Sequence, residues 1–209
     1  MQQHEIHNLK RDYLTEELGS FVNMGGAVLK TKALYEMGFT DRMISEFIKS
    51  GQLRRLKNGY YCPVSPDITQ AQIISELFPD GVLCMESALY AYHYIEERPL
   101  KWCIAIDKDT SKSRFSMEYP MVKPYYAESK VLSFGVSEIE LDGFSFKIYD
   151  KERLICEILR FETQLEPSYV KAALLSYVKE SNKNIAHLLQ YAKERKVITK
   201  VRNTIGLWL

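Results

Sequence analysis

The chain of 209 residues has little of what side-chain catalysis usually requires. It contains four histidines and four cysteines, and it lacks the serine-nucleophile elbow, the phosphate loop, the dinucleotide fingerprint and the zinc-protease motif. The cysteines are widely spaced and form no Cys-x-x-Cys pair, which indicates reduced thiols in a core. We therefore expect a protein that is not an enzyme and that has neither a cofactor nor a bound metal.

Long apolar runs are missing as well. No stretch approaches the roughly 18 apolar residues of a membrane span, and no charged-then-apolar leader opens the chain. The composition is 46% hydrophobic and 26% charged, which is enough for a good core in one large or two small domains. We expect a soluble, cytoplasmic protein without a membrane partner.

The formal net charge of +1 conceals an uneven layout along the chain. Residues 25–62 carry seven positive and three negative side chains, and residues 183–209 carry six positive and one negative. The middle, residues 63–182, is acidic, with 13 positive and 19 negative side chains. Positive charge is therefore concentrated in two places where an anionic partner could bind.

The region 25–62 has the element order of a winged helix-turn-helix. The spacing of apolar residues predicts a helix over 30–37, and Gly38 can supply the positive φ that ends it. Thr40 can cap a second helix, which Gly51 ends. A further helix over 4–21 would precede the pair.

The second of these helices has two distinct faces. Its apolar residues form one stripe, consisting of Met43, Ile44, Phe47 and Ile48. Arg42, Ser45 and Lys49 stand at i, i+3 and i+7 on the opposite face. Such a face is typical of a recognition helix that reads DNA.

A basic hairpin follows this helix. Asn58-Gly59 favours a type I′ turn between its strands. The flanking side chains, cationic before the turn and aromatic after it, suit a wing along a phosphate backbone; they are Arg54, Arg55, Lys57, Tyr60 and Tyr61. The alternative is a small helical domain with a solvated basic face, or a helix-turn-helix that binds protein instead of DNA.

Residues 63–66 form the one punctuated stretch between two patterned regions, so we expect a winged helix-turn-helix domain over 1–62 and a second domain over 67–209. The second domain is predicted to be α+β, with a mainly antiparallel sheet and C-terminal helices. The predicted strands are 102–106, 121–126, 131–134, 137–141 and 144–149. The predicted helices are 68–77, 85–94, 151–161, 168–177, 185–195 and 197–205.

Candidate chemical groups have structural alternatives. His4 and His7 lie one helical turn apart, and a solvated helix face explains them better than a metal does. His93 is better explained by packing on a helix than by a role as general base. Asp150, with Asp142 or Glu140, could form a metal-dependent nuclease site, but Asp150 also fits a helix cap.

Three segments together resemble the AbiEi-type antitoxins of bacterial abortive-infection, type IV toxin-antitoxin systems. The first is Leu29-Lys30-Thr31-Lys32-Ala33-Leu34, Gly38-Phe39-Thr40 and the run from Ile48 to Tyr61. The second is Glu86-Ser87-Ala88-Leu89, and the third is the run from Lys147 to Glu157. Their order and spacing carry the resemblance over nearly the whole chain.

The resemblance implies an antitoxin that also represses its own operon. The winged helix would bind inverted repeats in promoter DNA, and the C-terminal domain would counteract a nucleotidyltransferase-like toxin, with or without a stable complex. The implied DNA contacts are Lys30, Lys32, Thr40, Arg42, Ser45, Lys49, Arg54, Arg55, Lys57 and Tyr60.

The basic residues of the second domain are less well explained by promoter binding. They are candidates for a second nucleic-acid contact, for a surface that meets the toxin or its RNA substrate, or for a solvated helix face. The candidates are Lys151, Arg153, Lys193, Arg195, Lys196, Lys200 and Arg202.

Overall fold

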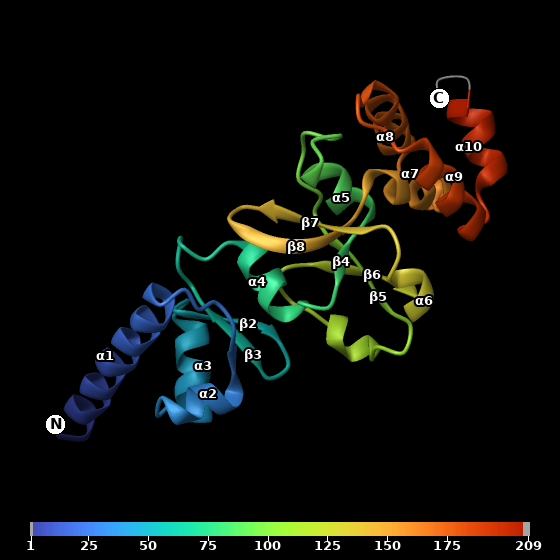
Figure 1. Ribbon diagram of the computed structural model, residues 1–209. Coiled ribbons are helices and arrows are strands. Elements are labelled where there is room, and N and C mark those ends of the chain that lie inside the picture. Colours follow the sequence, from blue (N-terminus) through green and yellow to red (C-terminus); the bar gives the residue numbers. More distant parts are fainter. Residues whose placement is uncertain (1, 207–209) are drawn as a thin grey trace. The chain divides into compact units, whose positions relative to one another are not determined.

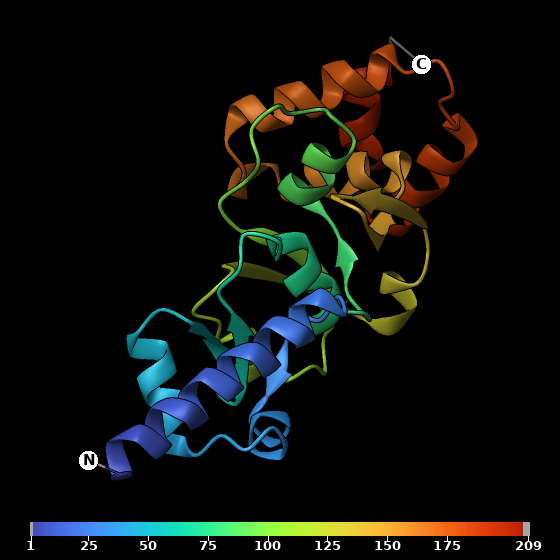
Figure 2. The ribbon, with the colours of Figure 1, turned by 90° about the vertical axis from the view of Figure 1, so that its left-hand side faces the viewer.

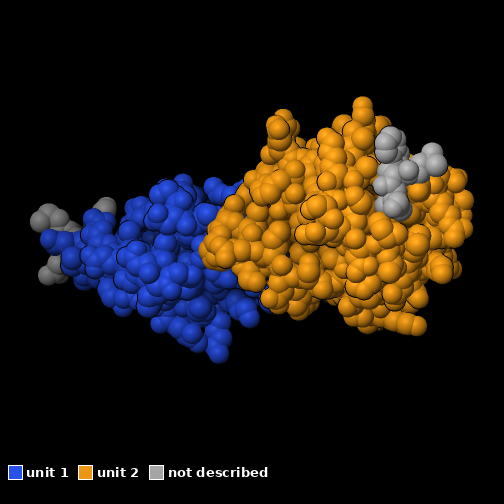
Figure 3. Space-filling model, turned by 45° about the horizontal axis from the view of Figure 1, so that its top comes forward, with its two compact units in different colours: residues 1–79, 116–120 blue, residues 80–115, 121–209 orange. Residues whose placement is uncertain are grey.

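The computed structural model describes residues 2–206, with side chains from residue 5 onward, and the chain divides into two compact units (Figure 3). The first unit comprises residues 1–79 and 116–120, and the second comprises residues 80–115 and 121–209. The stretch 63–66, where we expected the domain boundary, therefore lies inside the first unit.

The first unit combines helices with a small sheet, in which β2 and β3 lie beside α3 (Figure 1). The sheet is antiparallel and has three strands in the order β1-β3-β2. The elements of the unit are α1 (Gln2–Asn23), β1 (Leu29–Lys30), α2 (Thr31–Glu36), α3 (Asp41–Lys49), β2 (Leu53–Lys57), β3 (Tyr60–Pro63) and α4 (Gln70–Leu77). α1 is visible along its whole length in Figure 2. The helix predicted over 30–37, the helix predicted between its cap Thr40 and Gly51, and the hairpin are thus confirmed as elements.

The core of the first unit brings α1, α2, α3 and the sheet together. Its buried residues are Leu14, Leu18, Leu29, Leu34, Phe39, Met43, Ile44, Phe47 and Leu53. The rings of Phe39 and Phe47 meet edge to face, with centroids 5.0 Å apart. The predicted apolar stripe of α3 is therefore the face that packs inward.

The turns of the first unit follow the local sequence only in part. Gly38 has a φ of +97°, a value that only glycine adopts readily, and it ends α2 as predicted. In the hairpin, Gly59 has a positive φ of +75° but Asn58 does not, so the turn is not the predicted type I′. The strand pairing shifts register between Arg55 and Lys57, and this irregularity in β2 accommodates a turn that is not type I′.

Two segments beyond residue 62 complete the first unit. In α4, the Glu76 carboxylate accepts hydrogen bonds from the backbone N–H groups of Ala27 and Val28, at 3.1 and 2.9 Å. Residues 116–120 add to β2, where the Glu118 N–H donates to the Leu56 carbonyl at 2.7 Å. These contacts connect residues far apart in sequence.

The second unit is built on a five-stranded sheet with the order β6-β5-β4-β8-β7, together with helices between its strands and after the last of them. Its strands are β4 (Val82–Leu83), β5 (Trp102–Asp107), β6 (Val122–Ala127), β7 (Val136–Leu141) and β8 (Phe144–Tyr149). Its helices are α5 (Met85–Ala91), α6 (Ser129–Leu132), α7 (Lys151–Arg160), α8 (Pro167–Lys179), α9 (Ile185–Glu194) and α10 (Ile198–Ile205), with 3₁₀ turns at Lys112–Phe115 and Glu162–Gln164.

Two expectations for this unit were wrong. The sheet is mixed, because β4 pairs with β8 and β5 with β6 in parallel, while the other two neighbouring pairs are antiparallel. The predicted strand 131–134 is instead a single helical turn, α6, in which the Val131 and Leu132 N–H groups donate to the Glu128 carbonyl. The prediction missed the short strand β4, which lies at the centre of the sheet.

α7 is the central helix of the second unit. Residues 152–159 are all buried, because α5, α8, α9, α10 and β8 pack around the helix. Its predicted cap is confirmed: the Asp150 carboxylate accepts a hydrogen bond from the Arg153 N–H at 2.7 Å. Charged side chains on this helix are thus carried into the interior.

Candidate functional site

α3 presents a polar face to solvent. Arg42, Ser45 and Lys49 are exposed, and the Arg42 side chain retains 85% of its accessible surface. The three predicted reading residues therefore lie on one accessible face of a helix whose other face is buried.

Two hydroxyl groups on this face have assigned partners. The Thr40 hydroxyl accepts a hydrogen bond from the Met43 N–H at 3.4 Å and caps the helix. The Ser45 hydroxyl donates to the Asp41 carbonyl at 2.9 Å, which leaves its oxygen lone pairs facing outward as acceptors. The two side chains keep hydrogen-bonding capacity for a ligand.

Arg42 belongs to a small charge network. Its Nε lies 2.9 Å from Glu46 Oε1, and the other Glu46 oxygen lies 3.2 Å from His7 Nε2. The hydrogen bond from Arg42 holds the pKa of Glu46 below its ordinary value. Exposed pairs of this kind are weak, so Arg42 can exchange Glu46 for another anion. The His4 side chain lies outside the described residues.

The hairpin arginines meet the segment 116–120. The Arg54 guanidinium stacks over the Tyr119 ring, with its central carbon 4.2 Å from the ring centroid. Arg55 lies 3.4 Å from a Glu118 carboxylate oxygen and donates to the Asn58 side chain at 3.2 Å. Both arginines remain exposed. No local sequence signal pointed to Glu118 or Tyr119, because they lie more than 60 residues downstream.

The remaining predicted DNA contacts of the first unit divide into accessible and buried residues. Lys30 and Lys32 are exposed, and Lys32 pairs with Glu36 at 3.7 Å. Tyr60 is half-buried, with the Lys57 ammonium 4.5 Å and the Lys30 ammonium 5.9 Å from its ring centroid. Lys57 itself is only 8% exposed, so its prediction as a phosphate contact was wrong.

The basic residues predicted to form a surface on the second unit do not all reach the surface. Arg153 is fully buried, with its guanidinium 3.9 Å and 4.5 Å from the ring centroids of Phe134 and Tyr149. Its Nε donates to Glu157 at 2.7 Å. Arg195 donates two hydrogen bonds to the same carboxylate, from Nε to Oε1 at 2.5 Å and from a terminal guanidinium nitrogen to Oε2 at 2.9 Å.

Glu157 thus pairs with the buried Arg153 and with the partly exposed Arg195. A buried carboxylate between two guanidinium groups is costly to disturb, because loss of one partner leaves an uncompensated charge. The assignment of Arg153 to an exposed interaction surface was therefore wrong. Arg195 stays partly exposed, with 11% of its side chain accessible, and the two residues help to hold α7 and α9 together.

The other candidates of the second unit are accessible to different degrees. Lys151 pairs with Glu180 at 2.6 Å, and Lys200 pairs with Glu162 at 2.7 Å. Lys193, Lys196 and Arg202 are exposed. Only these last three present cations without an ion pair among the described residues.

The acids around Asp150 do not converge. Asp150 caps α7 and accepts from the Tyr191 hydroxyl at 3.3 Å, and its burial raises its pKa. Asp142 pairs with Arg98. Within residues 2–206, no three histidine, cysteine or acidic side chains are grouped so that they could hold a metal ion.

The cysteines and His93 are not arranged for nucleophilic chemistry. All four thiols are free and buried, and burial raises the pKa of Cys62 and of Cys156 to about 12. Such thiols stay protonated and unreactive at neutral pH. His93 is exposed, with a left-handed φ of 57°, rather than packed on a helix as predicted. None of the described helices has the length and apolar composition needed to cross a membrane.

The chain is similar in fold to a solved structure. No protein-family model and no curated protein sequence matches the chain. The crystal structure of the RV2827C protein from Mycobacterium tuberculosis aligns with a TM-score of 0.66, covering 87% of this chain and 71% of that chain at 13% identity. At this identity the similarity concerns the fold alone.

Proposed function

We propose that the first unit is a winged helix-turn-helix that binds double-stranded DNA. The observation that carries this proposal is the exposed row of Arg42, Ser45 and Lys49 on α3, opposite the buried stripe of the same helix. In this proposal α3 is the recognition helix in the major groove and the β2–β3 hairpin is the wing.

The order of elements supports the proposal. A helix pair separated by a glycine turn is followed by a hairpin, and the first short strand, β1, closes the sheet on the free side of β3. This arrangement places β2 at an edge of the sheet, and β2 carries Arg54 and Arg55. A wing of this kind can follow a phosphate backbone while the helix reads bases.

The side chains suggest distinct roles at the DNA. Arg42 can donate two parallel hydrogen bonds to a guanine edge once it leaves Glu46, and Thr40, Ser45 and Lys49 can bind neighbouring bases or phosphates. Lys30, Lys32, Arg54, Arg55 and Tyr60 would contact the backbone or an adjacent minor groove. Lys57 is omitted because it is buried.

Glu118 limits the charge that the wing offers. Its carboxylate pairs with Arg55 and lies in the same segment as Tyr119, which stacks on Arg54. Tyr119 would keep the Arg54 guanidinium extended, whereas Glu118 would compete with phosphate for Arg55. The proposed DNA contact therefore involves three separate parts of the sequence, which are α3, the β2–β3 hairpin and the segment 116–120.

We propose further that the protein is an antitoxin that represses its own operon. The resemblance of three segments to AbiEi-type antitoxins supports this role, and the second unit would then counteract a nucleotidyltransferase-like toxin.

Footprinting on the DNA upstream of the gene tests the DNA-binding proposal. We expect protection of an inverted repeat, and loss of protection in an Arg42→Ala, Lys49→Ala variant that unfolds like the wild type. Lys193→Ala with Lys196→Ala removes the same charge from the second unit and should leave the footprint unchanged. A wild-type chain that fails to bind at moderate salt would instead favour a protein-interaction module without a DNA contact.

A further inference from the structure

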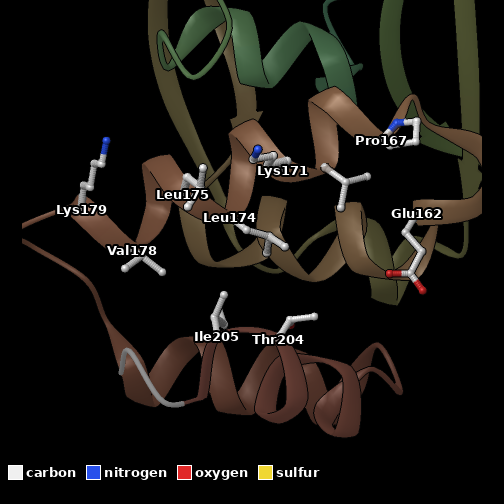
Figure 4. Close-up of a pocket in the computed structure, with 10 residues that line it drawn as sticks. Glu162, Pro167, Lys171, Leu174, Leu175, Val178, Lys179, Thr204 and Ile205 are labelled. Atoms are coloured by element: carbon white, nitrogen blue, oxygen red, sulfur yellow. The ribbon is translucent and has the colours of Figure 1, made fainter.

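An apolar groove opens between α8 and α10 of the second unit (Figure 4). Its volume is about 730 Å³, and Leu174 and Val178 of α8 point across it toward Ile205 of α10. The remaining lining residues are Glu162, Pro167, Val170, Lys171, Leu175, Lys179 and Thr204. Grooves of this size lined by aliphatic side chains usually bind something, because exposed apolar surface is otherwise unfavourable.

The α8 side of the groove has a charged rim. Lys171, Leu175 and Lys179 stand at i, i+4 and i+8, so they form one row along the helix. Leu175 is 51% exposed although it is apolar, and both lysines are exposed. Neither lysine forms an ion pair with any of the described residues.

The one acidic group in the lining is already neutralised. Glu162 Oε1 lies 2.7 Å from the Lys200 ammonium, which also donates to the Leu159 carbonyl at 2.9 Å. The groove therefore combines an aliphatic floor with a net positive rim. The positive rim favours an occupant whose apolar side chains form a ridge and whose negatively charged side chains lie beside that ridge.

We propose that this groove docks an amphipathic helix of a protein partner, with the apolar ridge of that helix against Leu174, Val178 and Ile205. Acidic residues on one flank of the helix then meet Lys171 and Lys179. Helix-in-groove binding of this kind uses apolar anchors at i, i+3, i+4 and i+7. α8 is 13 residues long, so a helix of about 14 residues, roughly 20 Å, matches the groove.

This surface is independent of the proposed DNA contact, because all its residues lie between Glu162 and Ile205. The two can therefore fail separately. A chain whose Arg54 and Arg55 are both replaced by alanine should keep the groove intact, and a groove variant should keep its DNA footprint.

The test measures the binding of two labelled synthetic peptides to the full chain by fluorescence anisotropy. Both are alanine-based helices of about 14 residues with the same leucine ridge, and they differ only in flanking glutamates or flanking lysines. We expect the glutamate peptide to bind at least about tenfold more tightly than the lysine peptide. Lys171→Glu with Lys179→Glu should reverse that preference.

Two further variants separate docking from folding. Leu175→Asp changes an exposed residue, so the chain should fold normally and bind both peptides more weakly. Lys130→Glu with Lys193→Glu alters charge by the same amount outside the groove and should preserve the preference for the glutamate peptide. Unfolding curves that match the wild type establish that each variant is folded.

Several outcomes would overturn the proposal. They are binding of neither peptide, equal binding of both, and a preference that the rim substitutions leave unchanged. A wild-type dimer that Leu175→Asp dissociates would assign the groove to a second copy of the chain. Peptide binding that appears only when the chain is cut after Gly206 would assign it to the chain's own following residues.

Discussion

The arginines of the two units differ in what surrounds them. In the first unit, Arg54 and Arg55 are exposed on a hairpin and make contacts that solvent or a ligand can replace. In the second unit, Arg153 and Arg195 share the buried Glu157 carboxylate. The comparison shows that a basic run predicts a binding surface only where its side chains stay in water, because buried charge is committed to its partners.

The largest expected effect comes from the buried group. Glu157→Gln keeps the size of the side chain but leaves the buried Arg153 and the largely covered Arg195 without a carboxylate, so unfolding should be easier by about 3–5 kcal/mol. Urea denaturation measures this change. Glu46→Gln, which alters the exposed partner of Arg42, is the matched control and should have little effect. Similar stabilities for the two variants would show that the buried ion pairs of the second unit contribute no more to stability than the exposed pair of the first unit.

Replacement of the exposed arginines should change DNA affinity rather than the stability of the fold. Arg54→Ala with Arg55→Ala should weaken binding to promoter DNA by about 1–3 kcal/mol, with little change in stability. The plot of log affinity against log salt has a negative slope, and this slope should become less steep by about 2 because two phosphate contacts are lost. Gel shifts over a salt series provide the measurement. Toxin neutralisation should persist, and its loss with unchanged operator binding would refute the two-part assignment.

The α3 cap links stability to the proposed DNA face. Thr40→Ala removes the hydroxyl that accepts from the Met43 N–H, so the first unit should lose about 1 kcal/mol of stability. Thr40→Ser retains the cap and serves as the control. Thermal unfolding followed by circular dichroism would distinguish the variants, and equal midpoints for alanine and serine would show that the hydroxyl does not cap the helix in solution.

A smaller effect, of opposite sign, is expected at Glu118. Glu118→Gln frees Arg55 and removes a negative charge beside the wing, so DNA affinity should rise a few-fold and the salt slope should steepen by less than about 1. The same salt series measures both quantities. Weaker binding by this variant would mean that Glu118 positions Arg55 rather than competing with phosphate. Absence of binding by the wild type would refute the DNA proposal itself.

The smallest effect concerns acid stability in the second unit. The Lys151 ammonium, and then the Tyr94 hydroxyl, hold the pKa of Glu180 below its ordinary value of 4.5. A lowered folded-state pKa contributes stability above the ordinary pKa, and this contribution is lost as the pH falls through the folded value. Glu180→Gln should therefore lose less stability than the wild type between about pH 7 and pH 3. Equal losses in thermal midpoint would contradict the role of this pair.

Much of the local structure follows from short stretches of sequence. The two faces of α3 follow from helical spacing, and Thr40 and Asp150 cap helices as their positions predict. Asp142 and Gly143 both have positive φ, as a type I′ turn requires, whereas Asn58 does not. The Asn58 hairpin differs because a bulge in β2 changes the geometry next to its turn.

Several of the errors involve partners that are distant in sequence. Parallel pairing of β5 with β6 depends on a crossover connection, part of which belongs to the first unit. Lys57 and Arg153 look like surface residues by type, but their neighbours in space bury them. No local pattern identifies Glu118 and Tyr119 as neighbours of the hairpin.

The sequence by itself determined most of the helices, most of the strands, the caps of α3 and α7, and the exposed row of Arg42, Ser45 and Lys49 on α3. These features depend on hydrogen bonds and side-chain periodicity within a few residues. Tertiary structure decided which cations stay at the surface, which strands run in parallel and where an apolar groove remains open. Those outcomes depend on burial, which is set by side chains that approach from elsewhere in the chain.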